Sequence, residues 1–181
     1  NWELLSEKLS VKGNKLVDLP LLKEIWTNRN ANTKKNPIFV QPVERAGKSV
    51  TDKLISIRNK MEELDASVHV ISSLDDVAWT LNLRGSDVQS NPVFLGYIIV
   101  TKNEAKLFVD LEKLDVDARK QMDDSWVKML PYEEFYHELK NIKNEKVLVS
   151  PNSNQSIFEA LKDNNTFIKA PVPGNLMKAI K

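Results

Sequence analysis

The chain has 181 residues and carries 26 Lys and Arg against 25 Asp and Glu, which leaves a formal net charge of +1. This balance provides no overall field that would attract nucleic acid or an anionic membrane. The absence of cysteine excludes disulfides, thiolate metal sites and a cysteine nucleophile, and no apolar run approaches the ~20 residues that span a bilayer. We therefore expect a cytoplasmic globular protein with one principal domain.

The two ends of the sequence differ from its centre. The segment 28–36 is polar and aperiodic, as is typical of a linker, and we expect the compact domain to begin near Asn36. Before it, Leu16–Pro20 is predicted to be extended and Leu21–Trp26 to form one or two helical turns. The chain starts without a methionine and stops on Met177–Lys181, a good helix former with no stop signal. We therefore expect a piece of a longer polypeptide.

The first strongly periodic stretch follows the linker. Apolar residues recur at steps of three and four over 50–64, which predicts a helix with one apolar stripe. Ser49 is placed to cap this helix, and Asp52 lies three residues on, near the positive end of the helix dipole. A short strand at Val68–Ile71 and a second helix opened by Ser73 are predicted next.

The best hairpin signal lies in the middle of the chain. The nearly continuous apolar run Val93–Val100 is followed by a polar turn, and the strand Ala105–Asp110 then returns. The other predicted elements are strands at 38–40, 126–130, 147–149 and 166–170, and helices at 115–122, at 131–139 beginning on Pro131, and at 154–162. This alternation predicts the α/β class, with a mixed, mostly buried sheet of about six strands flanked by helices on both faces.

The sequence holds few groups that could carry chemistry. His69 falls in a predicted strand and His137 on a predicted helix, and neither has a partner at a metal-ligand spacing. The five glycines form no nucleotide-binding pattern, and adjacent carboxylates such as Asp75 and Asp76 point in different directions on a helix. We predict no catalytic residue and no metal ligand in this chain, while a site assembled from scattered Asp and Glu is left open.

One polar turn stands apart as a candidate site. The predicted second helix runs into Asn82, Arg84, Gly85 and Asp87 before the hairpin begins. We expect Gly85 to adopt a positive φ where the helix ends, Arg84 to pair with Asp87, and Asn82 to bind loose backbone groups. Two interpretations remain open: an internally satisfied turn, or a turn whose Arg84 projects into a substrate cleft shared with another domain.

This turn belongs to a longer pattern, formed by the runs Leu74–Trp79, Asn82–Val88, Asn91–Phe94 and Leu107–Asp110. The pattern resembles the middle domain of the eukaryotic-type, three-domain aminopeptidase P (Xaa-Pro aminopeptidase) of the creatinase/prolidase superfamily. The opening residues resemble the link that leaves the first domain of that family, and the closing residues resemble the entry to its catalytic domain. The resemblance thus divides the chain into a link at 1–35, a compact middle domain with the creatinase N-terminal fold at 36–174, and a helix start at 175–181.

The resemblance also implies what the longer protein does. It would remove an N-terminal residue that precedes proline, acting as a homodimer on proline-containing peptides with two Mn²⁺ ions in a C-terminal domain. The family's metal ligands all lie in that C-terminal domain, so none is carried over to this chain. The middle domain is expected to contact the other domains of the chain and to position the first one over the active site. The alternative is a creatinase-fold regulatory or binding protein without peptidase activity.

Overall fold

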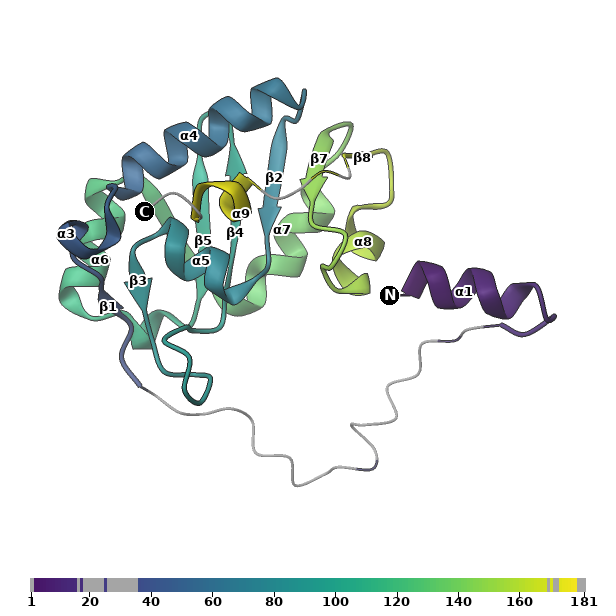
Figure 1. The fold of residues 1–181 in the computed structure, drawn as a ribbon, viewed down its shortest axis with the longest axis horizontal. Helices are drawn as coiled ribbons and strands as arrows, with labels where there is room; N and C mark the ends of the chain where they lie inside the picture. Colours follow the sequence, from purple (N-terminus) through teal and green to yellow (C-terminus); the bar gives the residue numbers. More distant parts are fainter. Residues whose placement is uncertain are drawn as a thin grey trace. The chain divides into compact units, whose positions relative to one another are not determined.

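The computed structural model of the chain describes residues 2–15, 17, 25, 36–168, 170 and 173–178 (Figure 1). The chain divides into two units, Asn1–Lys34 and Lys35–Lys181. The first unit contains helix α1 (Trp2–Ser10), and the second contains every strand described. Three predicted segments lie wholly or mostly outside the described residues: Leu16–Pro20, Leu21–Trp26 and the linker at 28–36.

A six-stranded mixed sheet forms the centre of the second unit. Its strands are β2 (Val68–Ile71), β4 (Gly96–Thr101), β5 (Ala105–Val109), β6 (Val127–Pro131), β7 (Lys146–Val149) and β8 (Thr166–Ile168). Their spatial order is β6-β5-β4-β2-β7-β8; β4 runs antiparallel to both β2 and β5, and the other neighbours are parallel. The predicted hairpin is confirmed, with Val100 opposite Ala105, although its first strand starts at Gly96 rather than at Val93.

One face of the sheet is covered by α4 (Val50–Glu63), α5 (Leu74–Thr80) and α6 (Val116–Asp124). The apolar stripe of α4 lies in the same core cluster as Ile98 and Leu107 of the hairpin. Figure 1 shows α4 and α5 in front of the sheet. The predicted amphipathic helix over 50–64 is therefore confirmed, and its stripe forms part of the core.

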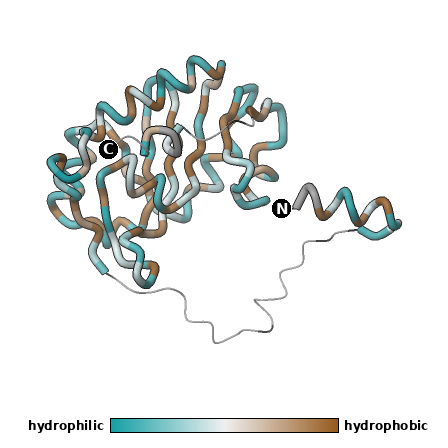
Figure 2. The backbone as a smooth tube through the Cα atoms, in the orientation of Figure 1, coloured by the Kyte–Doolittle hydropathy of each residue, from teal (hydrophilic) through white to brown (hydrophobic). Residues whose placement is uncertain are grey.

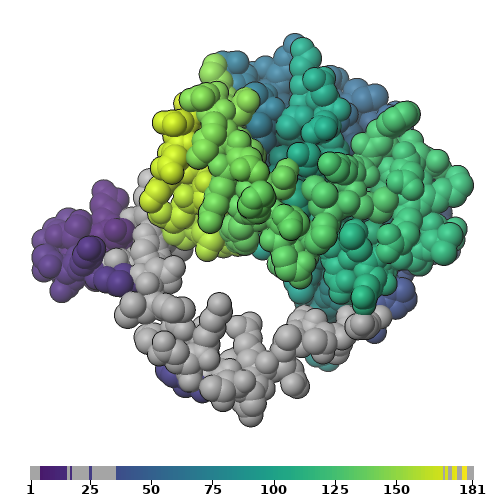
Figure 3. Space-filling model, turned by 180° about the vertical axis from the view of Figure 1, so that it is seen from behind, coloured from purple at the N-terminus to yellow at the C-terminus, as the bar shows by residue number. Residues whose placement is uncertain are grey.

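The opposite face is covered by α7 (Phe135–Asn141) and α8 (Gln155–Leu161), which share a second core cluster with Ile99 and Val147. Successive residues of a strand point to opposite faces, so neighbours in β4 belong to different clusters. The tube in Figure 2 shows hydrophobic stretches along the strands, and the space-filling view from behind in Figure 3 shows the side that carries α7. The prediction of a mixed sheet with helices on both faces is confirmed.

The two predicted helix starts differ in how they are capped. Ser49 is the N-cap of α4, and its hydroxyl oxygen accepts the N–H of Asp52 at 3.1 Å. Ser73 also occupies the N-cap position of α5, but its hydroxyl donates to the Asp75 carboxylate and makes no capping bond. Both serines thus mark a helix start, and only Ser49 closes it with its side chain.

Short elements complete the second unit. Strands β1 (Phe39–Val40) and β3 (Leu83–Arg84) form a separate antiparallel pair. A helical segment does follow Pro131, as predicted, but Pro131 is its N-cap rather than its first helical residue. With a ψ of 141°, Pro131 also ends β6, an edge strand where a missing N–H is tolerated. The remaining short helices are α3 (Val43–Ala46), η1 (Leu111–Lys113), η2 (Tyr132–Glu134) and α9 (Pro173–Lys178). Among the described residues, none of the helices is both long and apolar enough to cross a membrane.

Candidate functional site

The polar turn singled out in the sequence begins where α5 ends and runs through β3 to Asp87. Helix α5 ends at Thr80, and Asn82 takes the left-handed conformation with φ of 51°. The prediction that Gly85 supplies the positive φ is therefore wrong; an asparagine tolerates this conformation just after a helix. Gly85 serves a close approach instead, because a Cβ built on it would lie 2.8 Å from the Cβ of Phe94.

Asn82 is buried and bonded to Lys53 of α4. The Lys53 side chain, in a residue that is 1% exposed, donates to Asn82 Oδ1 at 2.5 Å and to the Trp79 carbonyl at 2.8 Å. Its ammonium lies 4.4 Å from the centroid of the Trp79 ring, within the range of a cation–π contact. Burial above all, with the nearby charges of Arg84 and Lys48, lowers the pKa of Lys53 to about 8. This lysine ties α4 to the turn.

Arg84 folds back onto the end of α5. Its guanidinium donates to the Ala78 carbonyl at 2.9 Å and to the Leu83 carbonyl at 2.8 Å. The Ala78 carbonyl is one of the last four of the helix, which have no partner within the helix itself. Burial lowers the pKa of Arg84, and a guanidinium remains charged at neutral pH all the same. The side chain thus closes the end of α5.

Asp87 has a different partner from the predicted one. It forms an ion pair with Lys113 of η1, and their side chains are 2% and 8% exposed. Its second carboxylate oxygen accepts the N–H of Leu95 at 2.8 Å. The expected pairing of Arg84 with Asp87 is therefore replaced by one across 26 residues of sequence, because the return of the hairpin brings η1 back to the turn.

We call Lys53, Asn82, Arg84, Asp87 and Lys113 the buried turn network. Within the described residues, no hydrogen bond or ion pair joins Asn82, Arg84 and Asp87 to one another. Asn82 bonds Lys53, Arg84 bonds two backbone carbonyls, and Asp87 pairs with Lys113, so two lysines that the sequence analysis missed belong to the set. The sequence does indicate that Lys53 is buried, because it falls on the apolar stripe of α4, where a solvent-exposed lysine is not expected. It gives no such indication for Lys113. These side chains use their polar groups for bonds within the same unit.

His69 lies elsewhere, in the centre of the sheet. It is fully buried, and its Nδ1–H donates to the Leu148 carbonyl at 2.9 Å. Because a carbonyl can only accept, Nδ1 carries the proton and Nε2 is left without a partner among the described residues. Burial lowers the pKa of His69 to about 4, against smaller opposing effects of that carbonyl and of Asp76. His69 is therefore a neutral core residue at physiological pH.

The described residues do not fit a metal centre. No group of three or more His, Asp or Glu side chains that could hold an ion comes together within the part of the chain that the structure describes. The His137 side chain is 71% exposed, and its Nδ1 lies 3.8 Å from a carboxylate oxygen of Glu134. Asp75 and Asp76 are ion-paired with Lys178 of α9. We therefore assign no described residue to the two Mn²⁺ ions that the resemblance implies and derive no step through them.

Known proteins match nearly the whole of this sequence. The pattern that defines the Creatinase/Prolidase N-terminal domain matches residues 28–181, and the chain belongs to this family. It is 35% identical to a probable Xaa-Pro aminopeptidase P from Laccaria bicolor, over 99% of this chain and 29% of that protein. A probable Xaa-Pro aminopeptidase P from Arthroderma gypseum is 36% identical, over 98% of this chain and 30% of that protein.

A solved structure agrees with the sequence matches. The crystal structure of X-prolyl aminopeptidase from Caenorhabditis elegans, described as a cytosolic enzyme with a di-nuclear active site, superposes with a TM-score of 0.84. The two chains are 30% identical, and the alignment covers 94% of this chain and 29% of the nematode chain. The chain thus spans about 30% of the length of these relatives. The predicted creatinase N-terminal fold is confirmed.

Proposed function

We propose that this chain is the non-catalytic middle domain of a metal-dependent Xaa-Pro aminopeptidase. In this proposal the longer enzyme removes an N-terminal residue that precedes proline, and this domain positions a first domain over the active site of a third. The similarity to aminopeptidases covers 98% to 99% of this chain and 29% to 30% of theirs, which supports a role as one domain of several. The enzyme is proposed to be a cytoplasmic homodimer that uses two Mn²⁺ ions bound outside this domain.

The observation that carries the non-catalytic role proposed for this domain is the buried turn network. The charged side chains of this network are Lys53, Arg84, Asp87 and Lys113, and each is engaged by groups of the same domain. A general acid or base must have a proton-exchanging atom free to reach the substrate, and a side chain spent on internal bonds stabilises the scaffold instead. We therefore propose Asn82, Arg84 and Asp87 as structural residues rather than as residues that contact substrate.

The test compares two lengths of chain on one substrate. The purified 181-residue chain is incubated with Ala-Pro-Ala and Mn²⁺, and released alanine is measured. We expect no release above the buffer blank. A longer chain that includes the residues following Lys181 in the parent protein is expected to release alanine, and to lose this activity when Mn²⁺ is chelated. Release by the 181-residue chain would overturn the proposal, and so would an inactive longer chain, which would favour a binding or regulatory role.

A further inference from the structure

After the neighbouring parallel strands β2 and β7, the chain continues on opposite faces of the sheet. Strands β2 and β7 end at the same edge, at Ile71 and Val149. The chain leaves β2 for α5, which packs in the first core cluster, and leaves β7 for α8, which packs in the second. In open α/β sheets, such diverging connections leave a crevice at the carboxyl ends of the strands, and ligands bind there.

The structure has a hollow at this point. Its volume is about 310 Å³, at the lower end of the range of roughly 300–1,000 Å³ found for ligand pockets. Its lining consists of 72–74 after β2, Ser150 and Asn152–Asn154 after β7, and Leu95, Tyr97 and Tyr132. We call this hollow the switch crevice. The hydroxyl oxygens of Ser72 and Ser153 lie 2.8 Å apart and join the two loops that form it.

The polar groups of the switch crevice are neutral. None of the described lining residues is charged; the lining offers serine hydroxyls, asparagine amides and tyrosine phenols. Each of these side chains can donate a hydrogen bond. A carboxylate or phosphate would meet no cation among these residues, so the favoured ligand is uncharged and rich in acceptors.

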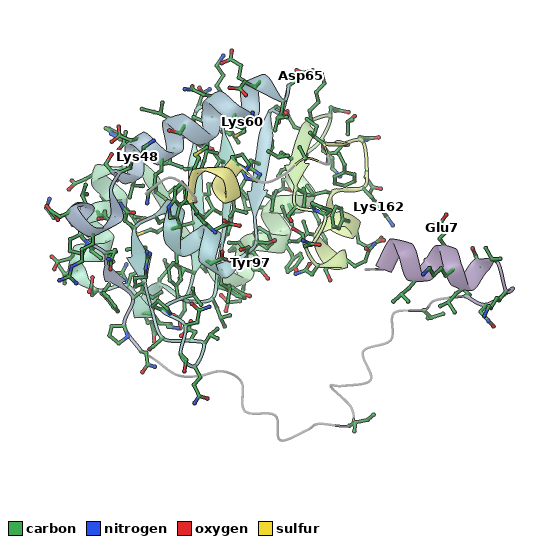
Figure 4. All side chains as sticks on the ribbon, in the orientation of Figure 1. Glu7, Lys48, Lys60, Asp65, Tyr97 and Lys162 are labelled. Atoms are coloured by element: carbon green, nitrogen blue, oxygen red, sulfur yellow. The ribbon has the colours of Figure 1, made fainter. Side chains whose placement is uncertain are left out.

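Tyrosine rings form one wall. The Tyr97 ring stacks on Phe135, with centroids 3.8 Å apart and an interplanar angle of 6°, and on Tyr132 at 5.3 Å and 30°. The phenol oxygens of Tyr97 and Tyr132 lie 3.3 Å apart. Burial, with the Tyr132 phenol, raises the pKa of Tyr97 to about 12, so this phenol stays protonated. Figure 4 labels Tyr97 at the lower end of the sheet. The Tyr97 and Tyr132 rings are inclined to each other and held in place by these stacking contacts, and each carries a phenol.

We propose that the switch crevice binds an uncharged proline-containing peptide segment in the extended polyproline II conformation. Proline rings would pack on the tyrosine wall, as they do in aromatic-lined grooves that recognise such segments. Proline has no N–H, so its segments present backbone carbonyls in excess. Ser73 already donates to Asp75, Ser72 and Ser153 bond each other, and the Tyr132 phenol donates to Tyr97. The Ser150 hydroxyl and the Asn152 amide, which donate no hydrogen bond within the described residues, are the donors that match these carbonyls. The inference rests on the proposed function, since proline-containing peptides are the proposed substrates, and it adds a second contact with them outside the active site.

The experiment follows backbone amide signals of the ¹⁵N-labelled 181-residue chain during titration with Ac-Ala-Pro-Pro-Pro-Ala-NH₂. We expect shifts confined to the switch crevice, including the amides of Ser72, Tyr132 and Asn152, and none with the peptide in which alanine replaces each proline. Tyr132→Ala should weaken binding about tenfold, since it removes an aromatic anchor. Asn152→Ala, at an exposed position that leaves the fold undisturbed, should weaken it about threefold. Trp126→Ala is the matched control, because that tryptophan is 90% exposed and lies outside the crevice.

Three results would overturn the inference: no shifts up to about 5 mM peptide, equal shifts with the alanine peptide, or equal weakening by Trp126→Ala. Shifts with glucose but not with the proline peptide would assign the crevice to a polyol and overturn it as well. The acetylated peptide has no free N-terminus to be cleaved, so binding is measured apart from any peptidase activity. If the longer chain is an active peptidase but the proline peptide does not bind the crevice, this inference alone is refuted. If the peptide binds the crevice but the longer chain is inactive, the proposed function alone is refuted.

Discussion

The buried turn network and the switch crevice are both polar loop regions, and they use their polar groups in opposite ways. The network contains charged side chains, and its one lysine–aspartate pair, Lys113 with Asp87, is almost fully covered. The crevice lining described above is neutral, and residues such as Asn152 are exposed. A charged residue in a loop is therefore a poor indicator of a site in this domain, since its charges are used to fix the loop.

Physical chemistry explains the difference. A buried charge is tolerated only when its partner and further hydrogen bonds compensate for the water it has lost, so removal of one partner is costly. A neutral hydroxyl or amide at the surface exchanges partners with water at little cost. Substitutions in the two regions should thus separate clearly in their effect on stability.

The largest effect is expected from Asp87→Ala, which leaves the Lys113 ammonium buried and unpaired. We expect the free energy of unfolding to fall by about 3–5 kcal/mol, measured by urea titration followed by circular dichroism. Glu63→Ala is the control, because Glu63 pairs with Lys60 at 2.5 Å while its side chain is 63% exposed, and it should cost less than about 1 kcal/mol. A double variant Asp87→Asn/Lys113→Met should lose less than Asp87→Ala. Equal losses for Glu63→Ala and Asp87→Ala would remove the distinction between the two regions.

A second effect depends on pH and comes from His69. Its pKa is about 4 in the folded chain against 6.5 for an ordinary histidine, so the unfolded chain binds more protons between these values. Stability is therefore lost as the pH falls from 6.5 to 4, by about 3 kcal/mol from this group. The measurement is the free energy of unfolding at both pH values for the wild type and for His69→Gln.

The His69→Gln variant should lose this share of the pH dependence, whatever its stability at neutral pH. An unchanged pH dependence in His69→Gln would mean that the imidazole reaches water in the folded protein.

A smaller effect is expected from Arg84→Ala, which removes two hydrogen bonds from a charged donor to backbone carbonyls. The loss should be about 1–3 kcal/mol, seen as a lower melting temperature. Arg45→Ala, on the exposed surface of α3, should change the stability by less than about 0.5 kcal/mol. In the longer enzyme, Arg84→Ala should leave kcat/KM unchanged. A lower kcat/KM with an unchanged melting temperature would instead place Arg84 in the substrate cleft.

The smallest effects are expected in the switch crevice, where two asparagines two residues apart should differ. Asn154 Oδ1 accepts the N–H of Ile157 at 3.2 Å and caps α8, so Asn154→Ala should cost about 1 kcal/mol. Asn152 is exposed, and Asn152→Ala should change the stability by less than about 0.5 kcal/mol. A large loss of stability in Asn152→Ala would show that the polar side chains of the crevice, like those of the turn, stabilise the fold.

Much of the fold could be predicted from local patterns. The helical spacing over 50–64, the hairpin and the alternation of strands with helices led to the correct class, because an element's period is set by its own residues. Predictions failed where neighbours decide. Pro131 was placed at the first helical position, whereas it ends the edge strand β6 and is the N-cap of the helical segment that follows. Gly85 was expected to turn the chain, but the close approach of Phe94 explains that glycine.

The candidate site was predictable only as a location. Its polar residues marked the stretch from the end of α5 through β3, yet the partners of Asn82 and Asp87 come from 26 to 29 residues away, in Lys53 and Lys113. The switch crevice left no motif at all, since its two loops are 81 residues apart at Ser72 and Ser153. Such contacts depend on the order of strands in the sheet, and local periodicity carries no record of that order.

The sequence by itself determined the alternation of helices and strands, the faces that become core, and the absence of cysteine chemistry. Only the tertiary structure decided which charges meet, which loops share an edge and which polar groups stay open to water. The physical reason is range. Periodicity and capping act within a few residues. The pairing of strands and charges, and the burial of side chains, depend on segments far apart in the sequence that meet only when the sheet has formed.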